Sequence, residues 1–289
     1  MPDDKLSVII PAFNKAAHSR RCLSALMQTK HRPMEIVVID NGSTDDTPTL
    51  LGESAGAASA AGIGFRHVRN ASNLGASTAR NQGLEASSGR YIAVMDNDIA
   101  IRQRSWAGKL IAALAERPDA AIVGPKLVFA TPPHLVQFAG GAVSPSGRVE
   151  FVGRGLPADT PWLNRPRDVQ CFISACWMMP RTIYDEQGGF DEIFNPVQFE
   201  DIDYSYRVRH AGYKILYVPD VQMYHFENVT TGMSPTLNST YLIIKNGLKF
   251  KARWEFMFAR ENGPRDDDIQ WANIEKVPLG QIGELELVD

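Results

Sequence analysis

The chain of 289 residues has little cysteine, little net charge and no long apolar run. Three cysteines are too few for a disulfide framework, and no second pair has the spacing of zinc ligands. A formal net charge of −3 argues against binding nucleic acid through bulk charge, so we expect no nucleic-acid partner. No stretch approaches the ~20 apolar residues of a membrane-spanning helix, and the start does not resemble a signal peptide. We therefore expect a cytoplasmic protein, with contact at the inner face of the membrane left open.

Several well-known active-site motifs are also missing. The sequence has no GxxxxGK[ST] loop and no GxGxxG after its first apolar run. Their absence argues against a P-loop protein and a Rossmann dinucleotide binder. Any phosphate chemistry in this chain must therefore depend on a metal ion.

The first half of the chain alternates strand and helix patterns. Strands are predicted over 6–10, 35–39, 65–68, 91–95 and 120–124, and helices over 16–29, 45–55, 76–87 and 105–116. The strands are nearly continuous in apolar residues, as strands buried on both faces are. We expect Ser43 or Thr44 to cap the second helix. The alternation predicts an α/β fold, with a doubly wound and mostly parallel sheet flanked by helices.

The second half is less regular. Residues 130–168 are expected to form loops or short strands, which we interpret as a smaller acceptor-side region. A buried strand is predicted over 169–180, a helix over 199–212 and a strand over 214–219. A basic helix is predicted over 236–260, and the acidic tail from 261 is expected to be loosely ordered. The Ser/Thr/Gly loop at 228–235 has the composition of a lid.

Polar residues follow three of the predicted strands: "PAFN", "DNGSTD" and "DND". In parallel α/β sheets, ligands bind at the carboxyl ends of the strands, so these segments should share one rim. Asp96 and Asp98 are two positions apart and can face the same cavity, where a divalent cation would relieve their repulsion. The alternative is an ordinary turn, and the same alternative holds for Asp40. Arg80 either reaches a nucleotide or pairs with Glu85.

A second acidic cluster begins the helix predicted over 199–212. Asp201 is well placed there to act as a general base at the mouth of a cleft. Asp203 is four positions from Arg207, so its alternative role is a helix-face ion pair. His225 lies after the strand predicted over 214–219. It would bind a metal ion if the end of that strand lies beside Asp98.

Six motifs, in order and at approximate spacing, resemble those of the family-2 glycosyltransferases. They are "SVIIPAFN", "EIVVIDNGSTDDT", "NLGASTARNQGL", "YIAVMDND", "GGFDEIF" and "FEDIDYSYRVRHAGYKILYVPD", the last followed by His225. The similarity runs from about residue 6 to 232 and implies a GT-A fold. It places a glycosyltransferase domain at 1–235, with a nucleotide-sugar half at 1–125 and an acceptor and catalytic half at 126–235. Residues 236–289 then form a C-terminal basic amphipathic helix and tail.

The resemblance also implies roles for single residues. Donor-binding positions are Pro11, Ala12, Asn14, Asp40, Arg80, Asp96 and Asn97. Asp98 would hold a divalent cation, Mn²⁺ or Mg²⁺, His225 would complete the metal site, and Asp201 would be the catalytic base. Phe13 and Lys15 depart from the family pattern, and the second leaves the role of the entry loop open.

The implied reaction is inverting transfer of a sugar from a nucleoside-diphosphate sugar to a hydroxyl of a saccharide or lipid-linked acceptor. The alternatives are a non-catalytic nucleotide-sugar-binding subunit and a sugar-phosphate nucleotidyltransferase. "FKARW" at 250–254 is similar to a motif of processive synthases, but Phe250 replaces its glutamine. The basic helix 236–260 either packs on the domain or docks on an anionic membrane.

Overall fold

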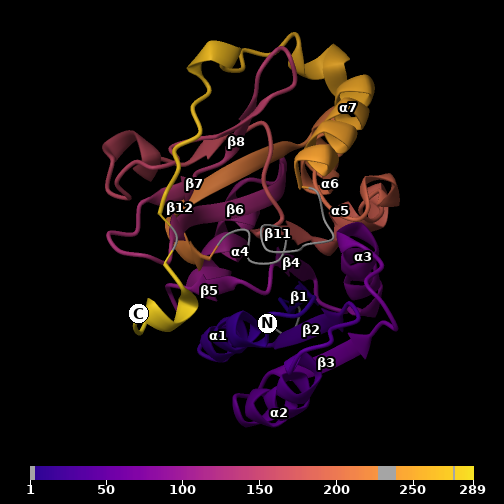
Figure 1. Cartoon of the computed structure of the whole chain (residues 1–289), viewed down its shortest axis with the longest axis vertical. Helices are drawn as coiled ribbons and strands as arrows, with labels where there is room; N and C mark the ends of the chain where they lie inside the picture. Colours follow the sequence, from indigo (N-terminus) through magenta and orange to yellow (C-terminus); the bar gives the residue numbers. More distant parts are fainter. Residues whose placement is uncertain (1–3, 227–238, 276) are drawn as a thin grey trace.

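The computed structural model describes residues 4–226, 239–275 and 277–289 (Figure 1). The lid predicted at 228–235 lies outside these residues. Within the described part of the chain, no helix combines the length and the apolarity that crossing a bilayer requires.

A ten-stranded sheet organises the molecule, and its main path runs β10-β12-β6-β11-β4-β1-β2-β3. Strand β5 pairs with β12, and β7 pairs with β6. The strands are β1 (Leu6–Ala12), β2 (Met34–Asp40), β3 (Gly64–Arg69), β4 (Tyr91–Met95), β5 (Ile99–Ile101), β6 (Ala120–Phe129), β7 (Val136–Phe138), β10 (Arg167–Asp168), β11 (Cys176–Pro180) and β12 (Lys214–His225).

Parallel pairing joins β4, β1, β2 and β3 into one block, and it also joins β6 to β12. Strand β11 runs antiparallel between β4 and β6. All ten residues of β6 are buried, which explains why the central strands carry so few polar residues. The α/β class with a mixed, mostly parallel sheet is confirmed.

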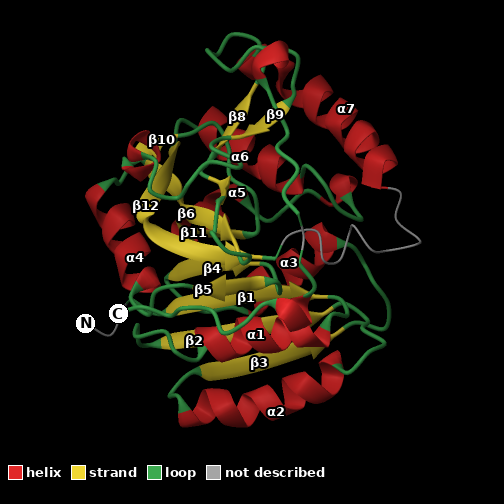
Figure 2. Ribbon diagram, turned by 60° about the vertical axis from the view of Figure 1, so that its left-hand side comes forward, coloured by secondary structure: helices red, strands yellow, loops and turns green. Residues whose placement is uncertain are grey.

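Helices lie on both sides of this sheet and at its ends (Figure 2). They are α1 (Ala16–Leu26), α2 (Thr47–Ala60), α3 (Ala76–Ala86), α4 (Trp106–Glu116), α5 (Arg181–Gln187), α6 (Glu200–His210) and α7 (Ser239–Phe258). In both views α2 lies beyond β3 at one end of the molecule and α7 lies at the opposite end.

Glycine sets the distance between α3 and the sheet. A Cβ on Gly83 would lie 2.2 Å from Cγ2 of Ile9 in β1, closer than real Cβ atoms come. Only glycine lets the helix backbone approach the strand so closely. This close packing places Arg80, one turn earlier, near the carboxyl ends of the strands.

Several element boundaries differ from the sequence prediction. Helix α2 begins at Thr47, and its first turn is supported by Asp45, which accepts hydrogen bonds from the Thr47 backbone N–H and hydroxyl. The predicted capping by Ser43 or Thr44 is therefore wrong. The strand predicted over 169–180 forms only from Cys176 onward, while the strand predicted over 214–219 continues to His225.

The second half contains short strands and 3-10 turns, as expected for 130–168. These are β8 (Gly141–Val143), β9 (Val149–Phe151), η1 (Pro161–Asn164) and η2 (Glu192–Phe194), followed in the tail by η3 (Asp266–Asp268) and η4 (Leu279–Gln281). The described residues of the tail, which the sequence predicted to be loosely ordered, have mostly irregular backbone apart from these two turns. Figure 1 shows the tail, in yellow, running from the end of α7 along the molecule toward β5 and α1.

Candidate active site

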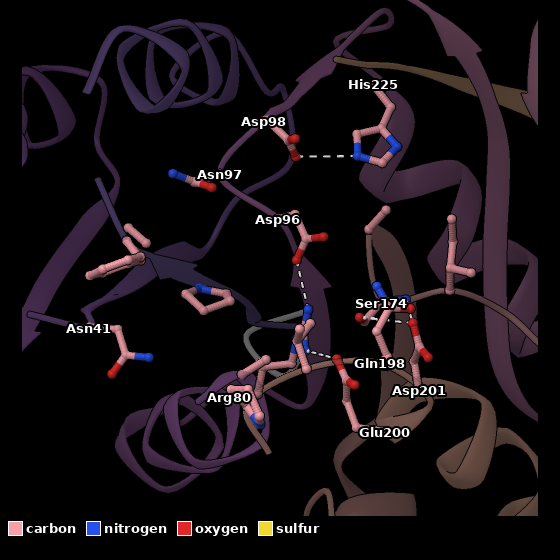
Figure 3. Close-up of a pocket in the computed structure, with 18 of the residues that line it drawn as sticks. Asn41, Arg80, Asp96, Asn97, Asp98, Ser174, Gln198, Glu200, Asp201 and His225 are labelled. Atoms are coloured by element: carbon pink, nitrogen blue, oxygen red, sulfur yellow. Dashed lines mark hydrogen bonds and ion pairs between the residues drawn. The ribbon is translucent and has the colours of Figure 1, made fainter. Parts of the chain in front are cut away.

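A cavity of about 340 Å³ opens beside the carboxyl ends of β1 and β4 (Figure 3). Eight of the ten predicted site residues line it: Pro11, Ala12, Arg80, Asp96, Asn97, Asp98, Asp201 and His225. They come from β1, α3, the turn after β4, the start of α6 and the end of β12. The structure thus brings together residues that are more than 200 positions apart in the sequence.

The two acidic residues lie in the turn that joins β4 to β5. Strand β12 pairs with β5, and this pairing sets His225 opposite Ile99, the residue after Asp98. As a result, potential ligand atoms of Asp96, Asp98 and His225 all lie within 4.8 Å of one another. Nε2 of His225 is 3.3 Å from a carboxylate oxygen of Asp98.

The environment of His225 fits a bound cation. Its Nδ1 lies 2.6 Å from the amide oxygen of Gln137, which accepts a hydrogen bond and so favours the proton on Nδ1. Nε2 then faces the Asp98 carboxylate, and the atom between them is a proton when His225 is charged or a metal ion when His225 is neutral. Burial opposes ionisation of Asp98, but the charge and hydrogen bond of His225 prevail and lower the pKa of Asp98.

Arg80 joins the acidic turn to α6. Its guanidinium lies 2.8 Å from Asp96 and 2.7 Å from Glu200, and the side chain is 4% exposed. Burial would favour the neutral form, but the carboxylates of Asp96 and Glu200 raise the pKa of Arg80, so it stays charged. Burial also raises the pKa of Glu200, and the neighbouring Asp201 adds to this shift. Arg80 does not pair with Glu85; instead, it orients Asp96 at the cavity wall.

Asp201, like its neighbour Glu200, is a first-turn carboxylate of α6 that lines the cavity. Its Oδ2 accepts hydrogen bonds from the backbone N–H of Ser174 at 2.8 Å and from the Ser174 hydroxyl at 3.2 Å. Figure 3 shows Ser174 and Asp201 facing each other on the side away from Asn97. A carboxylate held by such donors keeps one orientation and remains able to accept a proton.

Two predicted donor-binding residues do not line the cavity. The Asp40 carboxylate is buried and binds the Ser43 backbone N–H and the Arg69 guanidinium. The Asn14 side chain accepts from the backbone N–H groups of Thr44 and Asp45. Both therefore stabilise the loop after β2, and their contact with a donor stays a prediction.

Asn97 and Asp203 also have structural partners. The Asn97 amide donates to the Ser19 hydroxyl on α1 at 2.8 Å, which holds the acidic turn against that helix. Asp203 pairs with Arg253 and accepts from the indole of Trp254, both on α7. The alternative role given to Asp203, a hydrogen-bonded pair with Arg207, does not form.

The sequence analysis missed further residues that line the same cavity, among them Asn41, Gln137, Ser174 and Trp271. Asn41 adjoins a predicted residue and follows a strand end, so its position in the motif was a usable signal. The other three lie in segments without a recognisable motif, and only long-range packing brings them to the cavity.

A comparison with known protein families matches residues 7–188 to the model described as glycosyl transferase family 2. This match covers more than half of the chain. The chain belongs to glycosyl transferase family 2. The resemblance inferred from the six motifs is thereby confirmed.

Curated relatives support the assignment of the chain to this family. An N-acetylglucosaminyl-diphospho-decaprenol L-rhamnosyltransferase of Mycobacterium tuberculosis is 26% identical over 83% of this chain and 84% of its own length. The uncharacterized protein y4gI of Sinorhizobium fredii is 28% identical over 86% of this chain. The chain spans 27% of the length of y4gI, so this relative is much longer.

The fold also matches a solved structure. A crystal structure of GalNAc-T7 with UDP, GalNAc and Mn²⁺ superimposes with a TM-score of 0.67 and 19% identity, over 86% of this chain and 48% of that chain. The family-2 chain therefore has the GT-A fold expected from the sequence.

Proposed function

We propose that this chain is an inverting glycosyltransferase, which moves a sugar from a nucleoside-diphosphate sugar to an acceptor hydroxyl. The observation that carries this proposal is the shared cavity: Asp201 faces the same space as the cluster of Asp96, Asp98 and His225. One carboxylate base and one separate acidic cluster match the needs of a direct displacement at a sugar carbon.

In the proposed reaction, Asp201 takes the proton from the acceptor hydroxyl. The hydroxyl oxygen bonds to the anomeric carbon while the bond from that carbon to the diphosphate oxygen breaks. The nucleoside diphosphate leaves with the electron pair of the broken bond. A single displacement inverts the anomeric centre, and no covalent enzyme nucleophile takes part.

Asp98 and His225, with Asp96 beside them, are the residues that would hold a divalent cation. When bound, such an ion supplies Lewis-acid neutralisation of the charge on the departing diphosphate. Carboxylates suit Mg²⁺ and Mn²⁺ alike, whereas an imidazole ligand favours the transition metal. GalNAc-T7 was crystallised with Mn²⁺, which supports the same choice here.

Pro11, Ala12, Asn41 and Asn97 form the donor side of the proposed site. Their position at the strand ends fits a nucleotide lying along the rim. The two alternatives are less well supported. A non-catalytic subunit would not need Asp201 held in the cavity by Ser174, and a nucleotidyltransferase would carry a glycine-rich loop after β1.

The acceptor is proposed to be a saccharide, free or linked to a lipid. Helix α7 exposes Tyr241, Ile244 and Leu248 beside Lys245, a combination that supports contact with an anionic membrane. Co-sedimentation with anionic and neutral vesicles tests this contact, and equal recovery in both pellets would argue against it.

A donor screen with a base variant tests the main proposal. UDP-, GDP- and dTDP-sugars are incubated with Mn²⁺ or Mg²⁺, and release of the nucleoside diphosphate is measured. For the donor that is consumed, we expect Asp201→Asn to keep nucleotide binding and to lose about 10²- to 10⁴-fold in rate. Asp185→Asn, an exposed change on α5, is the matched control. An unchanged rate in Asp201→Asn would exclude this residue as the base.

A further inference from the structure

The C-terminal tail is fixed to the body of the molecule at three places before and around its tryptophan. Glu261 accepts from Arg209 at 2.7 Å, and Asp266 accepts from Ser146 at 2.8 Å. Farther along, the carbonyl of Ala272 accepts from Nε of Arg154 at 3.0 Å. We call residues 261–275 and 277–289 the C-terminal strap.

The far end of the strap is fixed to the opposite half of the chain. Arg21 on α1 donates to the carbonyl of Ile282 at 2.7 Å. Val288 exchanges backbone hydrogen bonds with Arg102 and Arg104, directly after β5. The strap therefore spans from the acceptor-side region to the helix that supports the acidic turn, and Figure 1 shows this course.

Between these anchors the strap contributes Trp271 to the lining of the active-site cavity. The Arg154 guanidinium lies 4.0 Å from the centre of the indole, and the ring of Phe151 lies 5.1 Å away at an angle of 59°. Despite these neighbours, Trp271 is 52% exposed. Its ring is thus held on one side by Arg154 and Phe151, while about half of the residue stays exposed and part of it lines the cavity.

We propose that Trp271 and Phe151 form an aromatic wall that binds a sugar ring of the acceptor. A pyranose presents a face of C–H groups that stacks on an aromatic ring, and its hydroxyls need polar partners at the edges. Gln198 and Ser174 line the same cavity and offer such partners. A purely lipid surface would offer no polar partner to the Gln198 amide.

The wall lies on the acceptor side of the proposed reaction. Trp271 packs on β9 and on the segment after it, whereas the proposed nucleotide rim is built from β1, β2 and β4. Ile173, which precedes the serine that orients Asp201, also lines the cavity. A sugar stacked on Trp271 would therefore enter from the side of the catalytic base. This inference rests on the proposed glycosyl transfer and specifies which residue selects the acceptor.

Indole N–H signals in ¹H–¹⁵N spectra test the wall directly. The sample is the full chain with diamagnetic Mg²⁺ and whichever of UDP, GDP or dTDP binds by calorimetry. Methyl glycosides of glucose, galactose, mannose, rhamnose and N-acetylglucosamine are then titrated in. The signal of Trp271 is assigned by its loss in Trp271→Phe. We expect one or more glycosides to shift it while the signal of Trp162, equally exposed but outside the cavity, stays in place.

Affinity measurements on variants complete the test. We expect Trp271→Ala to weaken glycoside binding about 3- to 10-fold, and Trp271→Phe to retain most of it, with nucleotide affinity unchanged in both. Trp162→Ala is the matched control. Nucleotide binding without any glycoside shift at Trp271, or equal glycoside affinity in Trp271→Ala, would overturn the aromatic wall alone. Failure of all three nucleotides to bind would instead contradict the proposed function.

Discussion

The two walls of the cavity are built in different ways. On one wall, the parallel strands β1, β2 and β4 end at a common rim, and the residues that follow each strand lie in short, recognisable motifs. On the other wall, Ser174, Gln137 and Trp271 come from three separate segments, of which only that of Gln137 is a strand, β7. The first wall follows from strand order, because parallel strands align their carboxyl ends. The second exists only through contacts between distant segments.

The largest effect is expected at the first wall, formed where β1, β2 and β4 end, which we call the motif-built wall. Asp98→Asn removes one charge from the candidate metal cluster, and we expect the Mn²⁺-dependent transfer rate to fall about 10³-fold. Initial rates measured across a Mn²⁺ series check this. Asp46→Asn, an exposed change before α2, should behave like the unmodified chain. Full activity of Asp98→Asn at the same Mn²⁺ concentration would remove Asp98 from the site.

The connection between the two walls comes next. Arg80→Met leaves Glu200 buried without its cationic partner, and we expect the free energy of unfolding to fall by about 3 kcal/mol. Urea denaturation measures this loss. Arg20→Met breaks the exposed pair with Glu53 and should cost at most about 0.5 kcal/mol. Equal losses in the two variants would contradict the role of Arg80 as a buried link.

A smaller effect is expected at the wall assembled from distant segments. Gln137→Leu removes the acceptor that fixes the tautomer of His225, and we expect affinity for Mn²⁺ to fall about 10-fold. Isothermal titration with Mn²⁺ gives the affinity, and Gln28→Leu on the exposed surface after α1 is the control. If Mn²⁺ binds Gln137→Leu as tightly as the control, His225 does not need this partner.

The smallest expected effect is on the free energy of unfolding, and it concerns Glu35 in β2, one of the strands of the first wall. Burial opposes ionisation of Glu35, but hydrogen bonds from Lys5, Ser7 and Ser88 lower its pKa to about 2. A folded-state pKa below the unfolded value near 4.5 stabilises the protein above pH 4.5, and this contribution is lost as the pH falls toward 2.

We therefore expect Glu35→Gln to lower the free energy of unfolding by about 1 kcal/mol at pH 7 and to flatten its decline in acid. Urea denaturation at pH 7 and at pH 3 measures both changes. Glu53→Gln, at an exposed position on α2, is the control. A loss of equal size at the two pH values would show that the charge of Glu35 does not contribute.

Much of the fold was accessible from the pattern of residues. Buried parallel strands need apolar side chains on both faces, so β1, β2, β4 and β6 were recognisable, and so was the rim at their ends. The catalytic and metal candidates Asp96, Asp98 and Asp201 followed from motif order. The predicted limits of strands were less accurate. At 169–180 the strand forms only from Cys176 onward, because no local signal marks where strand pairing begins.

The amino-acid order alone established the α/β class, the family and the acidic residues at the strand ends. Tertiary structure decided which of those residues share a cavity. It turned Asp40 and Asn14 toward the loop after β2, it set His225 beside Asp98 by pairing β12 with β5, and it laid a tail of unremarkable composition across the molecule with Trp271 in the cavity. Local propensity covers a few neighbouring residues, whereas a binding site is defined by contacts between segments that only the folded chain brings together.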